Sequence, residues 1–471
     1  MNISYSLLLL TLLPIAAQSL KFILNSRDKL FEVNENFLSV ALDSSSIQHH
    51  FTGFNLTDPF LTNLVRHLAP LYFRVGGTYA DRIVFSEKDE EGTIGASDVT
   101  FLASDYVKLY QFTQNVGARL IYDLNSLLRS ENGTWDSENA EEMIKFSNEH
   151  NMELDWELGN EPDLYSGIYN TSVNASELAK DYKALRNILN NYTLYESSYL
   201  LGIDLASIGS NQDYLQTFLQ EAGDVVYGTT WHQYYFAAKD ATEDLFLNPN
   251  TFNILAEKAH VMKDVVERAG QGNKIWLGET STAYNGGAAN MSNRFIGTFL
   301  WIDKLGLGAS LGMEVIIRQT IFYSNYALID NNYVPNPDWW VSVLYKTLVG
   351  TTVLTLENDG TTNNTVRLYA HCGLGASSRV TVFGINVANE EAVVEISGFQ
   401  AGSKVQSYEL VSESTLYSQF IKLNGEILKV KSNGDLPDLK AKSIENSGNF
   451  TLPAYSITFL VFDDTDVTAC L

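Results

Sequence analysis

Short apolar runs alternate with stretches of helical periodicity between residues 37 and 322. The runs are rich in branched and aromatic residues and end in polar residues or glycine, as strands do where they meet a loop. The stretches between them repeat apolar residues at the spacing of one helix face. The expected strands are 37–43, 72–78, 119–125, 153–160, 199–205, 225–235, 274–280 and 314–322, and the expected helices are 61–71, 104–116, 136–150, 176–189, 212–222, 252–269 and 292–311.

This order of strands and helices predicts an α/β fold, namely a (β/α)₈ TIM barrel. Two strands are apolar at each position over 275–277 and 315–317, which fits a parallel sheet that is covered on both faces. Catalytic groups of such barrels lie at the C-terminal ends of the strands. Candidate residues are therefore those that end or follow the apolar runs.

From about residue 349 the pattern changes to short strands separated by Gly, Asn and Ser, which predicts a β-sandwich. The expected sandwich strands are 352–356, 366–370, 379–387, 392–396, 404–410, 427–430 and 456–462, with one or two more at 21–33. The expected parts of the chain are a signal peptide at 1–19, N-terminal strands at 20–34, a catalytic barrel at 35–348 and the sandwich at 349–471.

The first 19 residues have the features of a secretory signal peptide, because an apolar run at 7–17 is followed by the small-residue pattern Ala17-Gln18-Ser19. No Lys or Arg precedes the run, so only the amino terminus supplies positive charge. The run is short for a bilayer span, and no other stretch approaches about 18 apolar residues. Secretion is expected, with a lysosomal destination as the alternative. Sequons that agree with secretion lie at Asn55, Asn132, Asn170, Asn174, Asn191, Asn290, Asn363 and Asn449.

Cys372 and Cys470 are the only cysteines. Two cysteines in an oxidising compartment most simply form one disulfide, and two free thiols are the alternative. Such a bond would join an early strand of the sandwich to the last segment of the chain.

The chain carries 31 Lys and Arg against 56 Asp and Glu, a formal net charge of −25. This charge disfavours nucleic acid and anionic membrane surfaces as partners. A polyanionic substrate would need a local basic patch. Solubility is the simpler explanation of the acidity, and the sequence does not predict an oligomeric state.

Two glutamates stand at the ends of apolar strands. Glu161 follows the fourth strand and precedes a proline, and Glu279 closes the seventh strand. Two carboxylates that meet at one barrel mouth are the groups used for acid–base and nucleophilic work on a sugar. The alternative is a pair of ordinary loop-edge glutamates that cap helices.

Other polar residues at strand ends are expected to lie near the two glutamates. His232 and Tyr234 lie two apart, so both can face the barrel mouth. Tyr234 is expected to hold Glu279 ionised, and His232 either to bond Glu279 or to be a satisfied core histidine. Trp231 and Trp276 are expected in the barrel core. The sequence has no metal-binding motif such as His-Glu-x-x-His, so neither a metal nor a cofactor is expected.

The segments 156–162 and 276–286 resemble the heparanase family, glycoside hydrolase family 79. The resemblance covers nearly the whole mature chain. It implies a barrel flanked by a β-sandwich that also takes the N-terminal strand, and retaining endo-β-glucuronidase activity. It also implies that Glu161 is the acid/base and Glu279 the nucleophile. Details at 74–78, 284–285, 318–321 and 335–338 look closer to leech hyaluronidase than to vertebrate heparanase.

The resemblance and the strand-end rule together give the expected substrate contacts. Asn160 would bond the sugar 2-hydroxyl, with a strand-end turn as the alternative role. The resemblance implies that Gly286 and Tyr326 hold the glucuronate carboxylate, with Asn285 standing where vertebrate heparanases have Gly. Arg74 and Arg318 are expected to pair with barrel carboxylates. The remaining expected cleft residues are Asn125, which is favoured over Asp123, and Tyr284 and Gln319.

Two departures from vertebrate heparanase bear on the substrate. The loop at 206–213 has no Lys or Arg, and the long excised linker shrinks to an acidic stretch at 85–101. Both disfavour highly sulfated chains. The sequence thus predicts a secreted endo-β-glucuronidase acting on a glycosaminoglycan, either hyaluronan or heparan sulfate, and active without cleavage of the 85–101 stretch. The alternative is a catalytically silent relative that binds polysaccharide.

Overall fold

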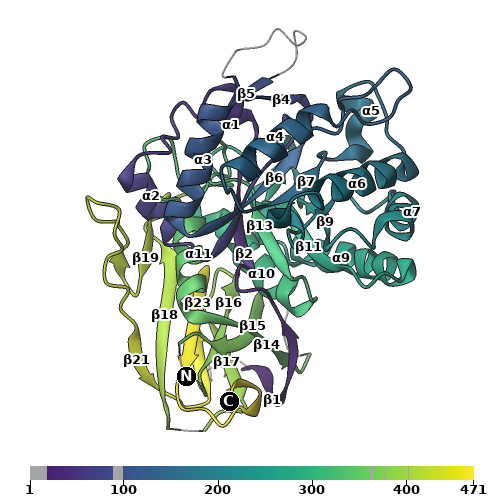
Figure 1. Cartoon of the computed structure of the whole chain (residues 1–471). Helices are drawn as coiled ribbons and strands as arrows, with labels where there is room; N and C mark the ends of the chain where they lie inside the picture. Colours follow the sequence, from purple (N-terminus) through teal and green to yellow (C-terminus); the bar gives the residue numbers. More distant parts are fainter. Residues whose placement is uncertain (1–18, 89–98, 361–363, 376, 401) are drawn as a thin grey trace, which may run out of the picture.

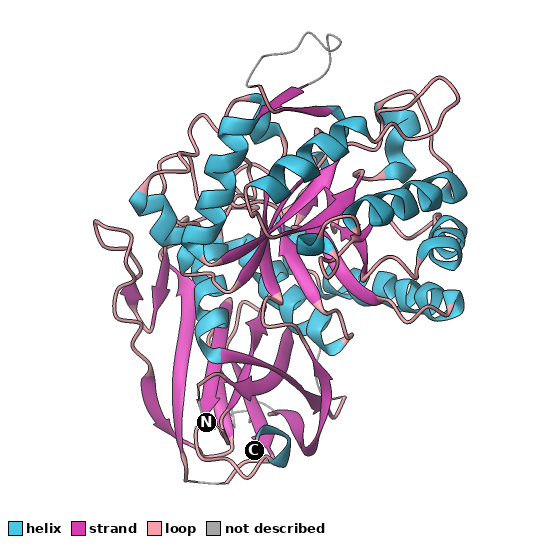
Figure 2. Ribbon diagram, viewed as in Figure 1, coloured by secondary structure: helices cyan, strands magenta, loops and turns pink. Residues whose placement is uncertain are grey.

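The computed structural model describes residues 19–88, 99–360, 364–375, 377–400 and 402–471. A helix-covered barrel forms one end of the molecule and a sheet unit forms the other, and the C-terminus lies at the sheet end (Figure 1, Figure 2). Nearly all of the expected signal peptide, Asn363 and most of the 85–101 stretch lie outside the described residues. No helix of the described ranges is long and apolar enough to cross a bilayer.

The barrel is an eight-stranded parallel sheet with the order β7-β6-β3-β2-β13-β11-β9-β8. A bridge between Trp156 and Leu200 nearly closes it between the outermost strands. The predicted TIM barrel is therefore confirmed. Its strands are β2 (Leu38–Asp43), β3 (Leu71–Gly76), β6 (Ala118–Leu124), β7 (Leu154–Leu158), β8 (Leu201–Leu205), β9 (Gly228–Gln233), β11 (Lys274–Thr280) and β13 (Val315–Arg318).

Helices surround the barrel on its outer face (Figure 2). The main ones are α2 (Pro59–Arg66), α3 (Ala103–Val116), α4 (Glu138–Glu149), α6 (Ala175–Leu189), α7 (Gln212–Ala222), α9 (Pro249–Ala269), α10 (Phe295–Ser310) and α11 (Pro337–Leu348). The sequence analysis did not predict α11, although Asn336-Pro337 is a recognisable helix start. It also extended the strands β9 and β13 into loops, because apolar loop residues continue both patterns.

The sheet unit contains one continuous sheet in the order β20-β19-β18-β23-β16-β15-β14-β1-β17-β22, with β21 beside β18. The N-terminal β1 (Leu20–Glu32) lies between β14 and β17, so the expected N-terminal contribution is confirmed. The sequence analysis did not predict β19, β21 or β22. The other strands are β14 (Val349–Asn358), β15 (Val366–Gly373), β16 (Val380–Asn386), β17 (Ala392–Ser397), β18 (Lys404–Ser412), β19 (Ile421–Leu423), β20 (Glu426–Ile427), β21 (Lys442–Glu445), β22 (Asn449–Leu452) and β23 (Ser456–Phe462).

One disulfide stabilises the sheet unit internally, and polar contacts hold it against the barrel. Cys372 and Cys470 form the predicted disulfide. At the boundary with the barrel, the buried carboxylate of Asp303 on α10 accepts hydrogen bonds from Arg367 at 2.5 Å and Tyr369 at 2.6 Å. Gly306 leaves the room for the Tyr369 ring, because a Cβ there would come within 2.1 Å of it. The two units therefore pack through a desolvated ion pair.

A buried histidine in β15 should make stability depend on pH. His371 is fully buried, its Nδ1 bonds the Gly350 carbonyl at 2.8 Å, and burial lowers its pKa to about 4. Between the unfolded value near 6.5 and the folded value near 4, the unfolded chain binds a proton that the folded chain does not. Stability therefore falls as pH drops through this window, by about 3 kcal/mol at most.

We expect denaturant unfolding to show this loss between pH 7 and pH 4.5, and His371→Gln to reduce the pH slope. His49→Gln, at an exposed position, is the matched control. Equal pH slopes in the His371→Gln variant and the unchanged protein would contradict the assignment.

Candidate active site

A left-handed turn after β7 carries Glu161. Gly159 has φ 83° and Glu161 has φ 56°, and a side chain at Gly159 would overlap a neighbouring tyrosine hydroxyl at 2.4 Å. The turn is held from both sides. The Asn160 N–H donates to the Asp81 carboxylate at 2.9 Å, and the Glu161 N–H donates to the Asp204 carbonyl at 3.0 Å. These contacts lift the Glu161 side chain to the barrel mouth.

Glu279 reaches the same mouth from β11. The register of β11 against β9 shifts between Leu277 and Glu279, and Gly278 at the shift faces a carboxylate oxygen of Asp204, which a Cβ would approach to 2.8 Å. The Tyr234 hydroxyl donates to Glu279 Oε1 at 2.8 Å. Arg74 donates to Glu279 Oε2 at 3.1 Å. Each oxygen of the carboxylate is thus oriented by its own donor.

Arg74 on β3 is the centre of a buried polar network below the mouth. It is fully buried, and its guanidinium donates to Glu157 at 2.7 Å, to Asn160 at 3.1 Å and to Asp204 at 3.3 Å, besides Glu279. A Cβ at Gly76 would come within 2.5 Å of this guanidinium. The glycine after Val75 is therefore required for the position of Arg74. The expected pairing with barrel carboxylates agrees with this geometry, and Arg318 likewise pairs with Asp338.

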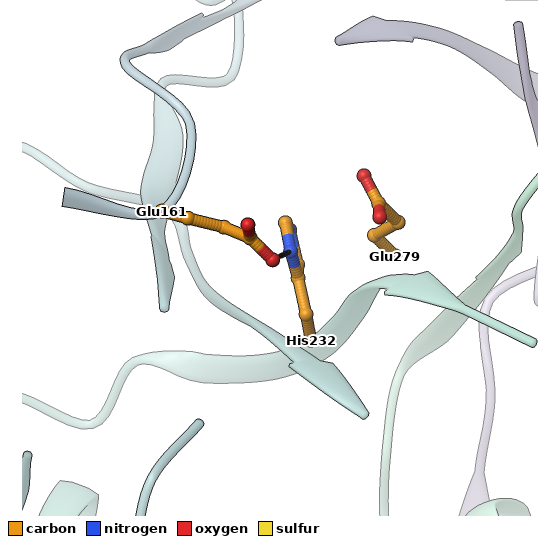
Figure 3. A group of neighbouring side chains, drawn as sticks. All are labelled: Glu161, His232 and Glu279. Carbon is orange, nitrogen blue, oxygen red and sulfur yellow. Dashed lines mark hydrogen bonds and ion pairs between the residues drawn. The ribbon is translucent and has the colours of Figure 1, made fainter. Parts of the chain in front are cut away.

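His232 connects the acidic groups on the other side. Its Nδ1 lies 2.9 Å from Glu161 Oε1 (Figure 3), and its Nε2 lies 3.3 Å from Asp204. Burial opposes a charged ring, but the negative charge of Glu279 and the bonds to Asp204 and Glu161 outweigh it and raise the pKa of His232 well above its usual range. Of the two alternatives expected for His232, the bond to Glu279 is not formed, and the buried ring instead contacts Glu161 and Asp204.

A cavity of about 680 Å³ opens beside these side chains at the C-terminal ends of the barrel strands, and neither Arg74 nor His232 lines it, although His232 is one of the expected site residues. Of the sequence-predicted residues, those that line it are Asn160, Glu161, Tyr234, Glu279, Tyr284, Asn285, Gly286, Gln319 and Tyr326. One oxygen of Glu161 and one of Glu279 lie within 4.8 Å of each other and of a His232 nitrogen. Two carboxyl groups at this separation, facing one hollow, are arranged to act on a single bond between them.

The comparisons with known proteins agree with this arrangement. The model of the N-terminal domain of glycosyl hydrolase family 79 matches residues 23–306. The chain belongs to glycosyl hydrolase family 79. Its family 79 relatives include a heparanase from Gallus gallus, 30% identical over 95% of this chain and 96% of the relative. A hyaluronoglucuronidase from Hirudo nipponia is 33% identical over 95% and 98%.

One more relative and one solved structure are also similar to this chain. A relative named inactive heparanase-2, from Mus musculus, is 28% identical over 95% of this chain and 88% of its own length. The fold is also that of a solved 4-O-α-L-rhamnosyl-β-D-glucuronidase from Fusarium oxysporum, with a TM-score of 0.71 at 16% identity over 93% of this chain and 99% of that one. The expected enzyme class, a glycoside hydrolase of the endo-β-glucuronidase type, is confirmed.

Two sets of side chains in this family 79 site have donor atoms of the kind that bind metal ions: Glu161, His232 and Glu279, and Asp123, Glu157 and Asp204. Arg74 already supplies the positive charge beside the second set, at 2.7 Å from Glu157 and 3.7 Å from Asp123. Burial raises the pKa of Asp123 well above its usual range and that of Glu157 to about 8, against the opposing charge of Arg74. Bound protons and the positive charge of Arg74 together thus offset the negative charge of this second set. The expectation of a metal-independent enzyme stays a prediction.

The prediction for Asn125 is wrong. Its side chain turns back from the end of β6, donating to the Ile83 carbonyl at 3.0 Å and accepting from the Leu127 N–H at 2.8 Å. It lines a separate small hollow instead of the cavity. Asn125 thus closes a turn, and Asp123 is sealed in the barrel beside Arg74. Trp231 and Trp276 are buried, as expected.

The sequence analysis missed several cavity residues. Asp43 ends β2 and holds the Gln319 amide at 2.8 Å, so the strand-end rule applied to the first strand would have found it. Asp81, which supports the Asn160 turn and does not line the cavity, has no such signal, because only the fold brings it there. The other missed lining residues are Ser45, Gly77, Thr78, Leu164, Ala206, Ser207, Thr320, Tyr323 and Ser324.

A buried lysine holds the two strand ends that carry Tyr234 and Glu279. The Lys304 ammonium, on α10, donates to Thr280 Oγ1 at 2.5 Å, to the Ser281 carbonyl at 2.8 Å and to the Gln233 carbonyl at 3.3 Å. Burial lowers its pKa well below the usual range. Lys304 does not line the cavity, so its contacts position the residues that do.

We expect Lys304→Met to lower kcat by about ten- to hundredfold with little change in KM, because a small displacement of a reacting group is that costly. Steady-state kinetics on any cleaved polymer would measure this, with the melting temperature recorded in parallel. Lys346→Met is the control, since the Lys346 ammonium bonds the Pro70 carbonyl at the opposite end of the barrel. Equal kinetic losses in both variants would show that Lys304 is only structural.

Proposed function

We propose that the chain is a secreted, retaining endo-β-glucuronidase that cleaves internal glucuronidic bonds of an unsulfated or weakly sulfated glycosaminoglycan, with hyaluronan the leading substrate. The observation that carries this proposal is the short separation of the two carboxyl groups, because one oxygen of Glu161 lies within 4.8 Å of one oxygen of Glu279. Retaining glycosidases hold their carboxyl groups about 5–5.5 Å apart, whereas inverting enzymes need about 6.5–9.5 Å to admit a water.

In the proposed reaction Glu279 attacks the anomeric carbon, and Glu161 donates a proton to the leaving oxygen. A water molecule then attacks the glycosyl-enzyme, with Glu161 as the base. Arg74 and Tyr234 keep the Glu279 carboxylate aimed at the sugar. The hydrogen bond from His232 orients Glu161 and balances its negative charge after the proton has left.

The glucuronate carboxylate is proposed to bind at Gly286 and Tyr326, and the 2-hydroxyl at Asn160. Tyr326 lines the cavity, and its ring stacks beside Tyr234, the donor to Glu279, with ring centroids 6.2 Å apart. Asn285 has φ 62°, a left-handed conformation that Asn tolerates better than most residues. The replacement of Gly by Asn is therefore compatible with the turn that presents Gly286.

The choice of substrate rests on charge. Among the described residues that line the cavity, Asp43, Glu161 and Glu279 are acidic and none is Lys or Arg. The loop after β8 has no cation of its own, although Lys258 approaches Gly209 from α9. The relatives are named for both heparan and hyaluronan cleavage. Sulfates need Lys or Arg partners, so the unsulfated polymer fits this cavity better.

Secretion and glycosylation belong to the proposal as well. Seven of the eight sequon asparagines lie in the described chain, and all seven are exposed. The alternative is a catalytically silent chain that binds polysaccharide, and one relative is named inactive heparanase-2. The donors on both oxygens of Glu279 and the Glu161–His232 contact support an active enzyme.

The test is release of reducing ends from hyaluronan, heparan sulfate and heparin, measured side by side at several salt concentrations. We expect hyaluronan to be cleaved faster than heparin. The chain carries −25, so added salt should speed attack on sulfated chains by roughly twofold or more as repulsion is screened. A preference for heparin that weakens with salt would contradict the substrate assignment, and no cleavage of any polymer would contradict the activity.

A further inference from the structure

A partly exposed arginine is held between two tyrosine rings near the catalytic cavity. Arg82 ends the short helix η1 (Ala80–Arg82), which follows Thr78, a residue that lines the cavity. Its guanidinium carbon lies 5.7 Å from the ring centroid of Tyr79 and 5.2 Å from that of Tyr169. Both distances are within the range of a cation–π contact.

The two loops that supply these rings also line the cavity. Tyr169 follows α5 (Tyr165–Ile168), which begins directly after Leu164, and both Leu164 and Thr78 line the cavity. The Tyr169 hydroxyl donates to the Thr78 carbonyl, so the loop after β7 is tied to the loop after β3. Because Arg82 contacts Tyr169, it lies at the edge of the cavity, beside the loop that carries the proposed acid/base.

No described carboxylate neutralises the positive charge of Arg82. Within the part of the chain that the structure describes, its guanidinium forms no ion pair and donates no hydrogen bond. The neighbouring Asp81 carboxylate is buried and accepts bonds from the Asn160 N–H and the Tyr165 hydroxyl, each at 2.9 Å. A chain with a net charge of −25 thus keeps an unneutralised cation at the edge of an acidic cavity.

The aromatic contacts hold the guanidinium and leave its donors open. An aromatic ring attracts the flat face of a guanidinium, whereas the N–H donors lie in the plane of the group. Those donors form a fork that matches the two oxygens of a carboxylate. Since the rings already restrict the side chain, little conformational entropy is left to lose when an anion binds. Arg82 is therefore preorganised for a carboxylate that approaches from solvent.

We propose that Arg82 binds the carboxylate of a second glucuronate of the substrate, one disaccharide away from the glucuronate that is cleaved. The inference rests on the proposed function, because it takes the substrate to be a chain of alternating glucuronate and N-acetylhexosamine. The first glucuronate is held inside the cavity and the hexosamine next to it is uncharged. The nearest further anion is therefore the following glucuronate. Arg82 thereby favours polymers over short glucuronides.

The test compares three substrates. The first is an activated aryl β-glucuronide extended at its non-reducing end by an N-acetylhexosamine, so it has a single carboxylate. The second is the same compound with one more glucuronate at that end, and the third is hyaluronan, which adds a leaving chain. We expect Arg82→Met to lower kcat/KM, chiefly through KM, by about five- to tenfold more for hyaluronan than for the first substrate.

The second substrate locates the bound glucuronate. A loss that matches the loss on hyaluronan places this sugar on the non-reducing side of the cleaved bond, and a loss that matches the first substrate places it in the leaving chain. Arg82→Lys keeps the charge without the planar fork, so its loss on hyaluronan should be smaller than that of Arg82→Met. Arg27→Met removes the same charge at an exposed position on β1 and should not discriminate between the substrates.

Equal losses on the first substrate and on hyaluronan, or an Arg82→Met variant that behaves like Arg27→Met, would overturn the assignment. If the unchanged enzyme cleaves no glucuronate polymer, the proposed function fails and binding decides the role of Arg82. Calorimetry of a hyaluronan hexasaccharide on the Glu161→Gln protein should then show about five- to tenfold weaker binding when Arg82→Met is added. Unchanged binding, or no binding to either protein, would overturn the role of Arg82.

Discussion

Glu161→Gln and Glu279→Gln are each expected to abolish turnover while leaving the protein folded. Glutamine keeps the shape of the side chain but can neither donate the proton nor attack the sugar. We expect a loss of roughly a thousandfold or more for the acid/base and on the order of 10⁴-fold or more for the nucleophile. Reducing-end assays with the favoured polymer would measure both, and circular dichroism would verify the fold.

Azide distinguishes the two roles. With an activated aryl β-glucuronide extended by an N-acetylhexosamine, azide should rescue Glu279→Ala as the inverted α-glycosyl azide, because the anion enters from the vacated face. It should rescue Glu161→Ala as the retained β-glycosyl azide, because Glu279 still forms the glycosyl-enzyme. Full activity in either glutamine variant, or the opposite pairing of products, would refute the assignment.

Arg74→Lys should damage both activity and stability. The guanidinium donates to four groups from a fixed plane, namely Glu157, Asn160, Asp204 and Glu279. A lysine keeps the charge but has three donors on one atom, so it cannot satisfy all four acceptors. We expect kcat to fall by about a hundredfold or more and the melting temperature to drop. Arg74→Met, which leaves the carboxylates without a cation, should cost about 3–5 kcal/mol of stability.

Arg119→Lys is the matched control for Arg74→Lys. Arg119 forms a two-point contact with Asp155, at 2.6 and 2.8 Å, near the start of β6 and away from the cavity. Its replacement should lower stability and leave kcat near its original value. If Arg74→Lys loses no more activity than Arg119→Lys, the network around Arg74 does not orient the site.

The sequence was sufficient for the parts that depend on local pattern. Apolar runs predicted the eight barrel strands, and the strand-end rule pointed to Glu161 and Glu279 because Glu161 follows its strand within a few residues and Glu279 stands near the end of its own. The disulfide needed only the count of cysteines. Tyr234 was placed beside Glu279 by its spacing on the strand, and the structure has that contact.

Other features depend on loop paths that no local pattern encodes. Asn125 follows its strand as Glu161 does, yet its loop folds back toward Ile83. The partner of His232 depended on the left-handed turn at Glu161, which swings that side chain across the mouth. Asp81 reaches the Asn160 turn from a different loop. Each of these positions is set by tertiary contacts between segments far apart in the chain.

The ion pair between Asp303 and Arg367 makes it unfavourable to separate the barrel from the sheet unit. Asp303 is buried on α10, directly before Lys304, and its partners Arg367 and Tyr369 come from the sheet unit. A barrel without that unit would lose both donors to Asp303 and would expose the side of α10 that packs against β14, β15 and β16. The N-terminal strand also belongs to the sheet. The protein should therefore unfold in one cooperative transition. Chimeras between relatives should exchange α10 and the sheet together.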